Sequence, residues 1–288
     1  MLLFKNIGEN NGQICKSGIL FYFRTLNHYK FLTMKKTLIY LSLLITVLSA
    51  CKKDKDDPTP VVNPAPTTYY GTESTIGNGI GKTFYTQSAA GVPLEAGVVL
   101  NADALTGLSG SSQMYSMPYH ANAAASGYTH ALLGWNPSGH PPFNIYGAPH
   151  FDFHFYRGMT EAERMMITGS NTAQFNNIPD SMYRPSDYLK DAVGIPMMGL
   201  HWVDQLAPEF NGGTFTRTFI YGSYDGKFVF YEPMITLAYL QTNPNEKIAV
   251  RQPPMVQETG YYPSNYNIKY LSQTNEYVVS VDLIKRQP

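Results

Sequence analysis

Histidine and aspartate alternate with phenylalanine along residues 149–156 (PHFDFHFY). Successive side chains of a β-strand point to opposite faces of the sheet, so we expect His150, Asp152 and His154 to share one face and the three phenylalanines the other. The phenylalanine face suits a hydrophobic core. The opposite face presents two imidazoles and a carboxylate, which are groups of metal coordination and of acid–base catalysis.

Strand geometry limits how these three side chains can act together. Neighbours on one face of a strand lie ~6.6 Å apart, which places His150 and His154 ~13 Å apart. Adjacent members can share one ion, whereas convergence of all three would require a bulge or a strong twist. We therefore expect Asp152 to form a centre with one or both histidines, either as a ligand or as the group that orients a histidine and fixes its tautomer.

Further ligands must come from other segments. His201, in residues 199–204 (GLHWVD), is the best candidate because it lies on a short predicted strand beside an aromatic residue. Glu232 is the next, because alternation places it on the same face as Phe228 and Phe230. A carboxylate that points into the protein requires a partner, and a metal or a histidine would be one.

An imidazole and carboxylate set of this kind suits Zn²⁺, Fe²⁺ or Mn²⁺ and does not suit Ca²⁺. With one coordination position open, the metal would activate water or polarise a carbonyl. The sequence therefore predicts a metal site formed from His150, Asp152, His154, His201 and Glu232, and favours a metal-dependent hydrolase or lyase.

A structural role for the histidines is the alternative, in which His150 and His154 hydrogen-bond to loop backbone. Six of the seven histidines fall between residues 120 and 201. His140 lies in a loop rich in proline and glycine, where it either closes over the site or, as we favour, shapes the loop. His120 and His130 have no metal-ligand context and are expected to be structural or surface residues.

A non-catalytic surface module, binding a glycan or another envelope ligand, is the second functional interpretation. It would require exposed, coplanar aromatic side chains and no metal, whereas burial in the core explains most of the aromatic residues. The aromatic residues in question are Tyr115, Tyr119, Trp135, Tyr146, Trp202, Tyr261 and Tyr262. A third interpretation is an envelope or assembly protein whose polar strand is only structural.

The elements that would position these residues are mostly strands. Short apolar or alternating segments separated by turn residues predict strands over residues 82–86, 97–100, 131–135, 150–156, 214–221, 227–232 and 278–284. Asp225-Gly226 supplies the turn of one hairpin. We therefore expect a mainly β fold, a single barrel- or sandwich-like domain with long loops and one or two short helices.

Helix signals are few. Residues 160–167 (TEAERMMI) predict a helix that Thr160 caps, with Glu163 completing a capping box, and that ends before Gly169. A second, shorter helix is expected around residues 186–192.

The N-terminal region has the features of an export signal. Lys35 and Lys36 precede an apolar run, residues 38–48, that ends in Leu48-Ser49-Ala50-Cys51. A basic start, a short apolar run and small residues before a cleavage point are typical of a secretory signal. The last four residues resemble the bacterial lipobox, which predicts a lipid-modified Cys51 and a location in the cell envelope, anchored to the outer membrane.

The chain therefore divides into four parts. Residues 1–33 are interpreted as a mis-called leader, residues 34–50 as the lipoprotein signal peptide, residues 51–68 as a proline-rich tether and residues 69–288 as a single β-rich domain. Without residues 1–50 the chain keeps 15 basic and 20 acidic residues, a net charge of about −5. This balance argues against a nucleic-acid partner and leaves the membrane, through the lipid, and a small molecule or glycan as expected partners.

Several blocks resemble a family of secreted or lipid-anchored bacterial domains of unknown function. They are residues 135–140 (WNPSGH), 149–156 (PHFDFHFY), 198–204 (MGLHWVD), 219–226 (FIYGSYDG) and 232–234 (EPM). The resemblance covers about residues 70–284 and implies one domain outside the cytoplasm. It implies no activity.

Overall fold

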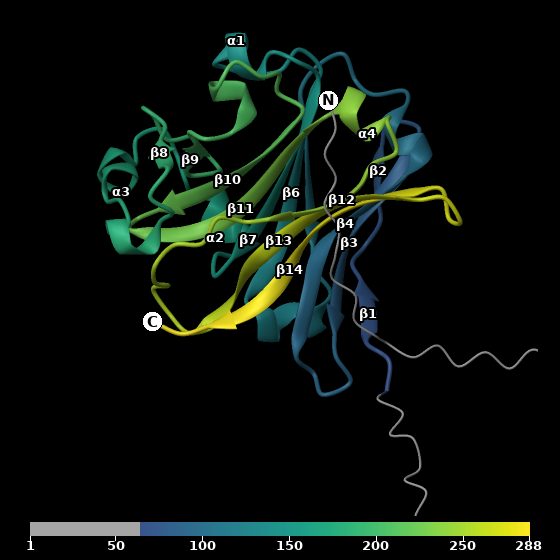
Figure 1. Ribbon diagram of the computed structural model, residues 1–288, viewed down its shortest axis with the longest axis horizontal. Helices are drawn as coiled ribbons and strands as arrows, with labels where there is room; N and C mark the ends of the chain where they lie inside the picture. The colour runs from purple at the N-terminus through teal and green to yellow at the C-terminus, as the bar shows by residue number, and fades with distance from the viewer. Residues whose placement is uncertain (1–63) are drawn as a thin grey trace, which may run out of the picture. The chain divides into compact units, whose positions relative to one another are not determined.

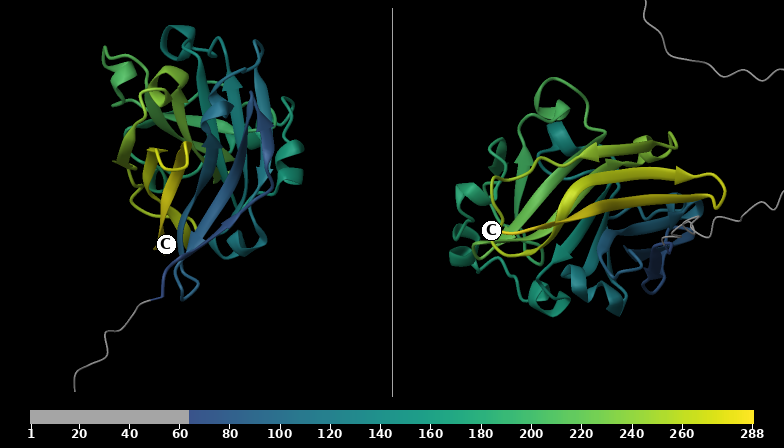
Figure 2. Two further views of the ribbon diagram at one scale, coloured as in Figure 1. Left: turned by 90° about the vertical axis from the view of Figure 1, so that its right-hand side faces the viewer. Right: turned by 60° about the horizontal axis from the view of Figure 1, so that its bottom comes forward.

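The computed structural model describes residues 64–288, which lie in one compact unit. Two antiparallel sheets of seven strands each form a sandwich (Figure 1), and Figure 2 shows the same layers from two other sides. The expected mainly β architecture is confirmed, as a sandwich and not as a closed barrel. The predicted leader, signal peptide and lipidated Cys51 lie outside the described residues.

The first sheet, sheet A, is formed by both ends of the described chain. In spatial order its strands are β1 (Thr67–Tyr70), β3 (Gly79–Gln87), β4 (Pro93–Asn101), β14 (Glu276–Arg286), β13 (Gly260–Leu271) and β12 (Asn245–Ala249), with β2 (Ser74–Ile76) paired to β3. The central pairing of β4 with β14 joins segments about 180 residues apart and therefore closes the domain.

The second sheet, sheet B, carries the residues predicted to form the site. In spatial order its strands are β5 (Gln113–Pro118), β6 (Tyr128–Asn136), β7 (His150–Arg157), β11 (Lys227–Thr236), β10 (Arg217–Tyr224), β9 (Leu200–Asp204) and β8 (Tyr188–Lys190). The β10–β11 hairpin turns at Asp225 and Gly226, whose φ angles of 47° and 77° match the predicted Asp-Gly turn.

The helices are short and lie in the connections. The α-helices are α1 (Phe143–Tyr146), α2 (Glu161–Met165), α3 (Thr172–Asn176) and α4 (Leu237–Leu240), and the 3₁₀-helices are η1 (Ala102–Leu105), η2 (Ala121–Ser126), η3 (Ser181–Tyr183) and η4 (Pro208–Phe210). Among residues 64–288, none of these helices has the length and apolar character needed to cross a bilayer.

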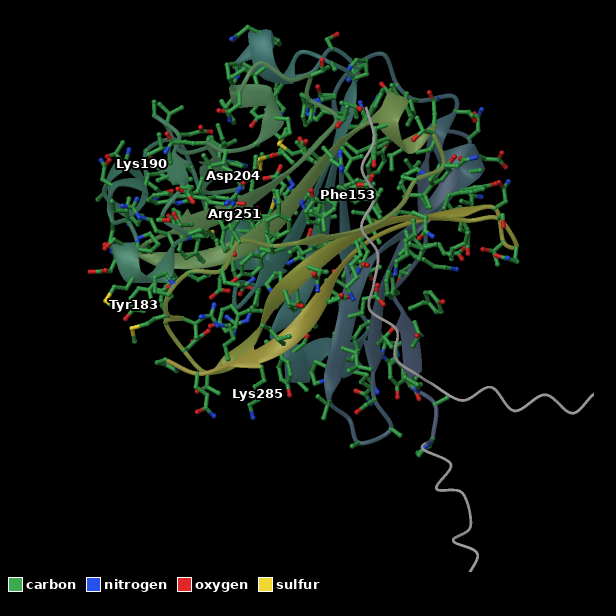
Figure 3. All side chains as sticks on the ribbon, in the orientation of Figure 1. Phe153, Tyr183, Lys190, Asp204, Arg251 and Lys285 are labelled. Atoms are coloured by element: carbon green, nitrogen blue, oxygen red, sulfur yellow. The ribbon has the colours of Figure 1, made fainter. Side chains whose placement is uncertain are left out.

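The core lies between the two sheets. Phe151, Phe153 and Phe155 of β7 are fully buried there, and Figure 3 labels Phe153 within the packed side chains. Burial of each ring stabilises the fold by about 2–3 kcal/mol. At one edge of the sandwich, Arg251 Nε donates a hydrogen bond of 2.8 Å to Asp204 Oδ2 and so links the segment after β12 to the end of β9 (Figure 3).

The predicted helix start at Thr160 is confirmed with its capping box. The Thr160 hydroxyl accepts from the Glu163 amide, and the Glu163 carboxylate accepts from the Thr160 amide, before α2. Arg164 then points from this short helix into the protein and is buried. Its packing, described below, fixes α2 against the outer face of sheet B.

The prediction of a helix around residues 186–192 is wrong. Tyr188–Lys190 forms β8, the edge strand that pairs with β9. The Tyr188 hydroxyl donates to the Phe219 carbonyl at 2.9 Å, and its ring lies 5.1 Å from that of Tyr221. The local helix preference of this segment is weak, and these long-range contacts override it.

Candidate metal centre

The five predicted ligands lie on three strands of sheet B. β7 contributes His150, Asp152 and His154, β11 contributes Glu232, and β9 contributes His201. β11 pairs with β7 and β10, and β10 pairs with β9, so adjacent strands bring these side chains to the face opposite the phenylalanine core. All five are buried. The predicted division of β7 into an apolar and a polar face is therefore observed.

His154, His201 and Glu232 form one group, which we call the buried triad. His154 Nε2 lies 3.4 Å from Glu232 Oε1, and His201 Nε2 lies 3.4 Å from Glu232 Oε2. The potential ligand atoms all lie within 4.8 Å of one another. One carboxylate thus stands between two imidazoles, an arrangement that could hold a metal ion.

His140, His150 and Asp152 form a second group, which we call the rim triad. His150 Nε2 lies 3.1 Å from Asp152 Oδ1, and His140 Nε2 lies 3.7 Å from Asp152 Oδ2. Its potential ligand atoms also lie within 4.8 Å of one another. His140, with 35% of its side chain exposed, stands at the outer edge of the group.

The row on β7 does not converge on a single centre. Asp152 pairs with His150, as expected, but His154 faces Glu232 instead of Asp152. The strand spacing is the reason, because alternate residues of one strand lie too far apart for three side chains to meet without a bulge.

Loop shaping, the role favoured for His140, does not describe this residue fully. Its Nε2 atom also lies 3.7 Å from Asp152 Oδ2. Asn136, at the end of β6, pairs in register with His150, at the start of β7. The connection between them must therefore return over the beginning of β7. This hairpin connection is the signal that sequence reasoning could have used to place His140 at the site.

The imidazole tautomers are set by backbone carbonyls. The Nδ1 atom of His150 lies 2.7 Å from the Ala148 carbonyl oxygen, and that of His154 lies 3.2 Å from the Leu132 carbonyl oxygen. A carbonyl only accepts, so each Nδ1 carries the proton. In the neutral ring Nε2 then holds a lone pair, and in both residues it faces a carboxylate oxygen.

Several buried polar atoms consequently have no hydrogen-bond partner. They are His150 Nε2, Asp152 Oδ1, His154 Nε2, His201 Nδ1 and Glu232 Oε2. Buried polar atoms in proteins are almost always satisfied, and leaving one unsatisfied costs about 1–3 kcal/mol. Lone pairs that face lone pairs are satisfied together by a cation, either a proton or a metal ion.

Burial controls the protonation of the buried triad. It lowers the pKa of His154 to about 4 and that of His201 to about 3, and raises the pKa of Glu232 well above its ordinary value, with further increases from Asp152 and Asp191. Without a metal ion, burial therefore favours the neutral form of all three groups, which is two neutral imidazoles beside a protonated carboxyl group.

The rim triad behaves in the opposite way. Burial alone would raise the pKa of Asp152 and lower that of His150, but the contact between the two outweighs it, so the pKa of Asp152 falls and that of His150 rises. His150 and Asp152 thus favour an ion pair when only protons are available. The same geometry lets a proton or a metal ion neutralise this carboxylate.

His130 provides an internal contrast on the same face of the sheet. Its Nε2 accepts a hydrogen bond of 3.1 Å from Arg164 Nε, and its ring stacks on Tyr156 at 4.5 Å. Burial, followed by the charge of Arg164, lowers its pKa to about 4. His130 is therefore a structural histidine, as expected, whose lone pair meets a donor and not another acceptor.

A cavity of about 520 Å³ opens over the buried triad and over His140 and Asp152 of the rim triad. Its polar lining includes Asn136, Asp191, His140, Asp152, His154, His201 and Glu232, and the rest is mainly apolar: Met114, Pro141, Pro142, Tyr146, Ala192, Val193, Ile195, Met198, Val203, Ile220 and Met234. This size and an apolar wall with few polar groups are typical of a small-molecule site.

Gly222 makes room for the packing behind the buried triad. It pairs with His201 and with Phe230, and a Cβ atom there would lie 2.0 Å from the Phe230 ring. The ring instead lies over this position, with its centroid 5.1 Å from those of both His154 and His201. The Phe230 ring thus packs against both imidazoles.

The aromatic residues considered for sugar binding are mostly in the core. Tyr119, Trp135, Tyr146, Trp202 and Tyr262 are buried, and only Tyr115 and Tyr261 are half-buried. None of these seven side chains is fully exposed.

Comparisons with protein-family models, with curated proteins and with solved structures find no match for this chain. The resemblance of its sequence blocks to secreted or lipid-anchored bacterial domains stays a prediction. The two triads and their cavity are therefore the features from which a function can be inferred.

Proposed function

We propose that the protein binds a divalent transition-metal ion, Zn²⁺, Fe²⁺ or Mn²⁺, at the buried triad and acts as a metal-dependent hydrolase or lyase. One observation carries the proposal. His154 Nε2 and Glu232 Oε2, both buried and without hydrogen-bond partners, belong to a triad whose potential ligand atoms lie within 4.8 Å of one another. A proton can satisfy one such contact, whereas one ion can satisfy all three side chains.

The chemistry of the ligand set supports a transition metal. Two imidazoles with one carboxylate are a common set for catalytic zinc and for non-haem iron, whereas Ca²⁺ prefers oxygen ligands. Three protein ligands leave further coordination positions for water or substrate. When bound, the metal would activate water or polarise a carbonyl.

The cavity supports a small substrate with an apolar body. Polar groups gather at the two triads, while side chains such as Met114, Ile195 and Ile220 form the walls. The substrate would therefore direct a polar head to the ion and pack its remainder against these walls. Asp191, which also lines the cavity, would be available to exchange a proton with the bound molecule.

We place the protein at the bacterial cell envelope, anchored to the outer membrane by a lipid on Cys51. The basic start, apolar run and lipobox-like residues 48–51 support this placement. A non-catalytic glycan-binding module is a weaker alternative, because the aromatic side chains that it requires are mostly buried.

Metal analysis of the full chain tests the proposal. After reconstitution and desalting, plasma mass spectrometry of the parent should find tightly held Zn, Fe or Mn that the double variant His154→Ala/His201→Ala lacks. His120→Ala is the matched control, because His120 is exposed and lies outside both triads. Circular dichroism verifies that the variants fold. Equal metal content in the parent and the double variant would contradict the proposal, as would its absence from both.

A screen of hydrolase and lyase substrates then tests the catalytic part. Activity should disappear with a chelator, return with the metal found in the parent, and be absent from the double variant. Activity that survives in the metal-free protein would contradict a metal-dependent reaction.

A further inference from the structure

We propose that the rim triad is a second cation site, in which His140, His150 and Asp152 bind a divalent transition-metal ion in the same cavity. The inference extends the proposed function, since it makes the cavity a two-metal centre. It depends, however, on a different set of atoms, so the two can fail independently.

The two triads repeat the same arrangement of donors. In each, a carboxylate stands between two imidazole Nε2 atoms: Glu232 between His154 and His201, and Asp152 between His150 and His140. His150 Nε2 and Asp152 Oδ1 are buried and only 3.1 Å apart. A proton between these two atoms makes an ion pair but leaves His140 Nε2 outside the contact, whereas one metal ion would join all three side chains.

Backbone carbonyls prepare both rim imidazoles for coordination. His150 Nδ1 donates to the Ala148 carbonyl at 2.7 Å, and His140 Nδ1 donates to the Pro141 carbonyl at 2.9 Å. Hydrogen bonds of this kind orient a ligating histidine and leave its Nε2 free for the ion.

The carboxylate of Asp152 is also held from behind. Its Oδ2 atom accepts a hydrogen bond of 2.7 Å from Asn136 Nδ2, which leaves Oδ1 for the ion. Gly134 pairs with Asp152 across β6 and β7, and a Cβ atom there would lie 3.3 Å from Oδ2. Asn136 and Gly134 thus fix the carboxylate and give it space, as outer partners of a metal ligand do.

The two sites differ in access to solvent. Every member of the buried triad lies on a strand and is buried, whereas His140 lies on the loop between β6 and β7 and has 35% of its side chain exposed. The rim ion should therefore exchange more readily than the buried ion.

The charge of two bound ions bears on the substrate class. Two divalent ions with only two carboxylate ligands leave net positive charge in the cavity, which favours a substrate with an anionic head group such as a carboxylate or phosphate.

Titration of the metal-free full chain with Co²⁺ tests the proposal, with visible absorption and mass spectrometry under native conditions as readouts. The parent should bind two equivalents in separate steps. His140→Ala should lose the weaker step, or weaken it at least about 100-fold, and keep the tighter one. His201→Ala should lose the tighter step. His120→Ala, the control, should match the parent.

The outcomes separate the two proposals. One equivalent that His140→Ala leaves unchanged and His201→Ala removes would overturn the rim site and support the buried site. Loss of an equivalent in His140→Ala alone, with His201→Ala unchanged, would support the rim site and overturn the buried site. Asp152→Asn, which keeps the side-chain shape, should reproduce the His140→Ala result, and binding unchanged in both variants would overturn the rim site.

Discussion

The Nε2 atom of His154 lies 3.4 Å from the Oε1 atom of Glu232, yet this nitrogen is buried without a hydrogen-bond partner. Because its Nδ1 proton is committed to the Leu132 carbonyl, the ring presents a lone pair to a carboxyl group. His130, on the same face, meets a guanidinium donor instead. This difference is why we propose His154, and not His130, as a metal ligand.

Glu232→Gln should remove the tightly held metal and leave the fold intact. The amide matches the shape of the protonated carboxyl group but is a poor ligand for a divalent ion, so metal affinity should fall by at least about 100-fold. Competition with a chromophoric chelator would measure the change. Glu276→Gln on β14, in the other sheet, is the control and should bind as the parent does.

Metal-free Glu232→Gln should also gain stability relative to the parent as the pH rises. Burial holds the pKa of Glu232 well above its ordinary value, so the folded parent keeps a proton that the unfolded chain releases. A group with a raised folded pKa contributes stability that is complete at low pH and is lost as the pH rises towards that pKa. Glutamine does not titrate.

Urea unfolding in the presence of a chelator at pH 5, 6 and 7 measures this effect. The difference in unfolding free energy should move in favour of the glutamine variant, by at most about 1.4 kcal/mol per pH unit while the pH lies between the unfolded and the folded pKa of Glu232. A difference that does not change with pH would show that Glu232 is ionised in the metal-free protein. Zn²⁺ at a concentration that fills only the tighter site should reverse the order, because the parent keeps the carboxylate ligand of the buried triad and the variant does not.

His130→Gln and His154→Gln should have opposite consequences. Glutamine at position 130 lacks the ring that stacks on Tyr156 and displaces the acceptor of Arg164 Nε, which should destabilise the protein by about 1–3 kcal/mol without changing metal content. Loss of His154 should remove metal with little effect on the metal-free fold. Thermal unfolding with and without chelator, together with metal analysis, distinguishes the two, and metal loss in His130→Gln would contradict our assignment.

Local sequence pattern predicted the part of the site that one strand determines. Alternation of period two put Phe153 in the core and Asp152 and His154 on the opposite face, because side-chain direction in a strand depends only on position. The capping box at Thr160 was predicted for the same reason, since its bonds span three residues.

The partners across strands could not be predicted in this way. Whether His154 meets Asp152 or Glu232 depends on the pairing of β7 with β11, whose residues lie about 80 positions apart in the sequence. The strand at Tyr188 exists only through its pairing with β9, so the local sequence predicts a helix there and misses the strand. The position of His140 depends on how a loop folds back over β7, which no local pattern specifies.

Gly222→Ala should weaken both the fold and the metal site. A Cβ atom at this position would lie 2.0 Å from the Phe230 ring, which packs against His154 and His201, so the ring and both imidazoles would have to move. Overpacking of this kind costs about 1–3 kcal/mol. Gly110→Ala is the matched control, because nothing lies within 4 Å of the added atom. We expect lower unfolding free energy and weaker metal binding in Gly222→Ala and no change in the control. Equal metal affinity in the two variants would show that Phe230 does not position the imidazoles.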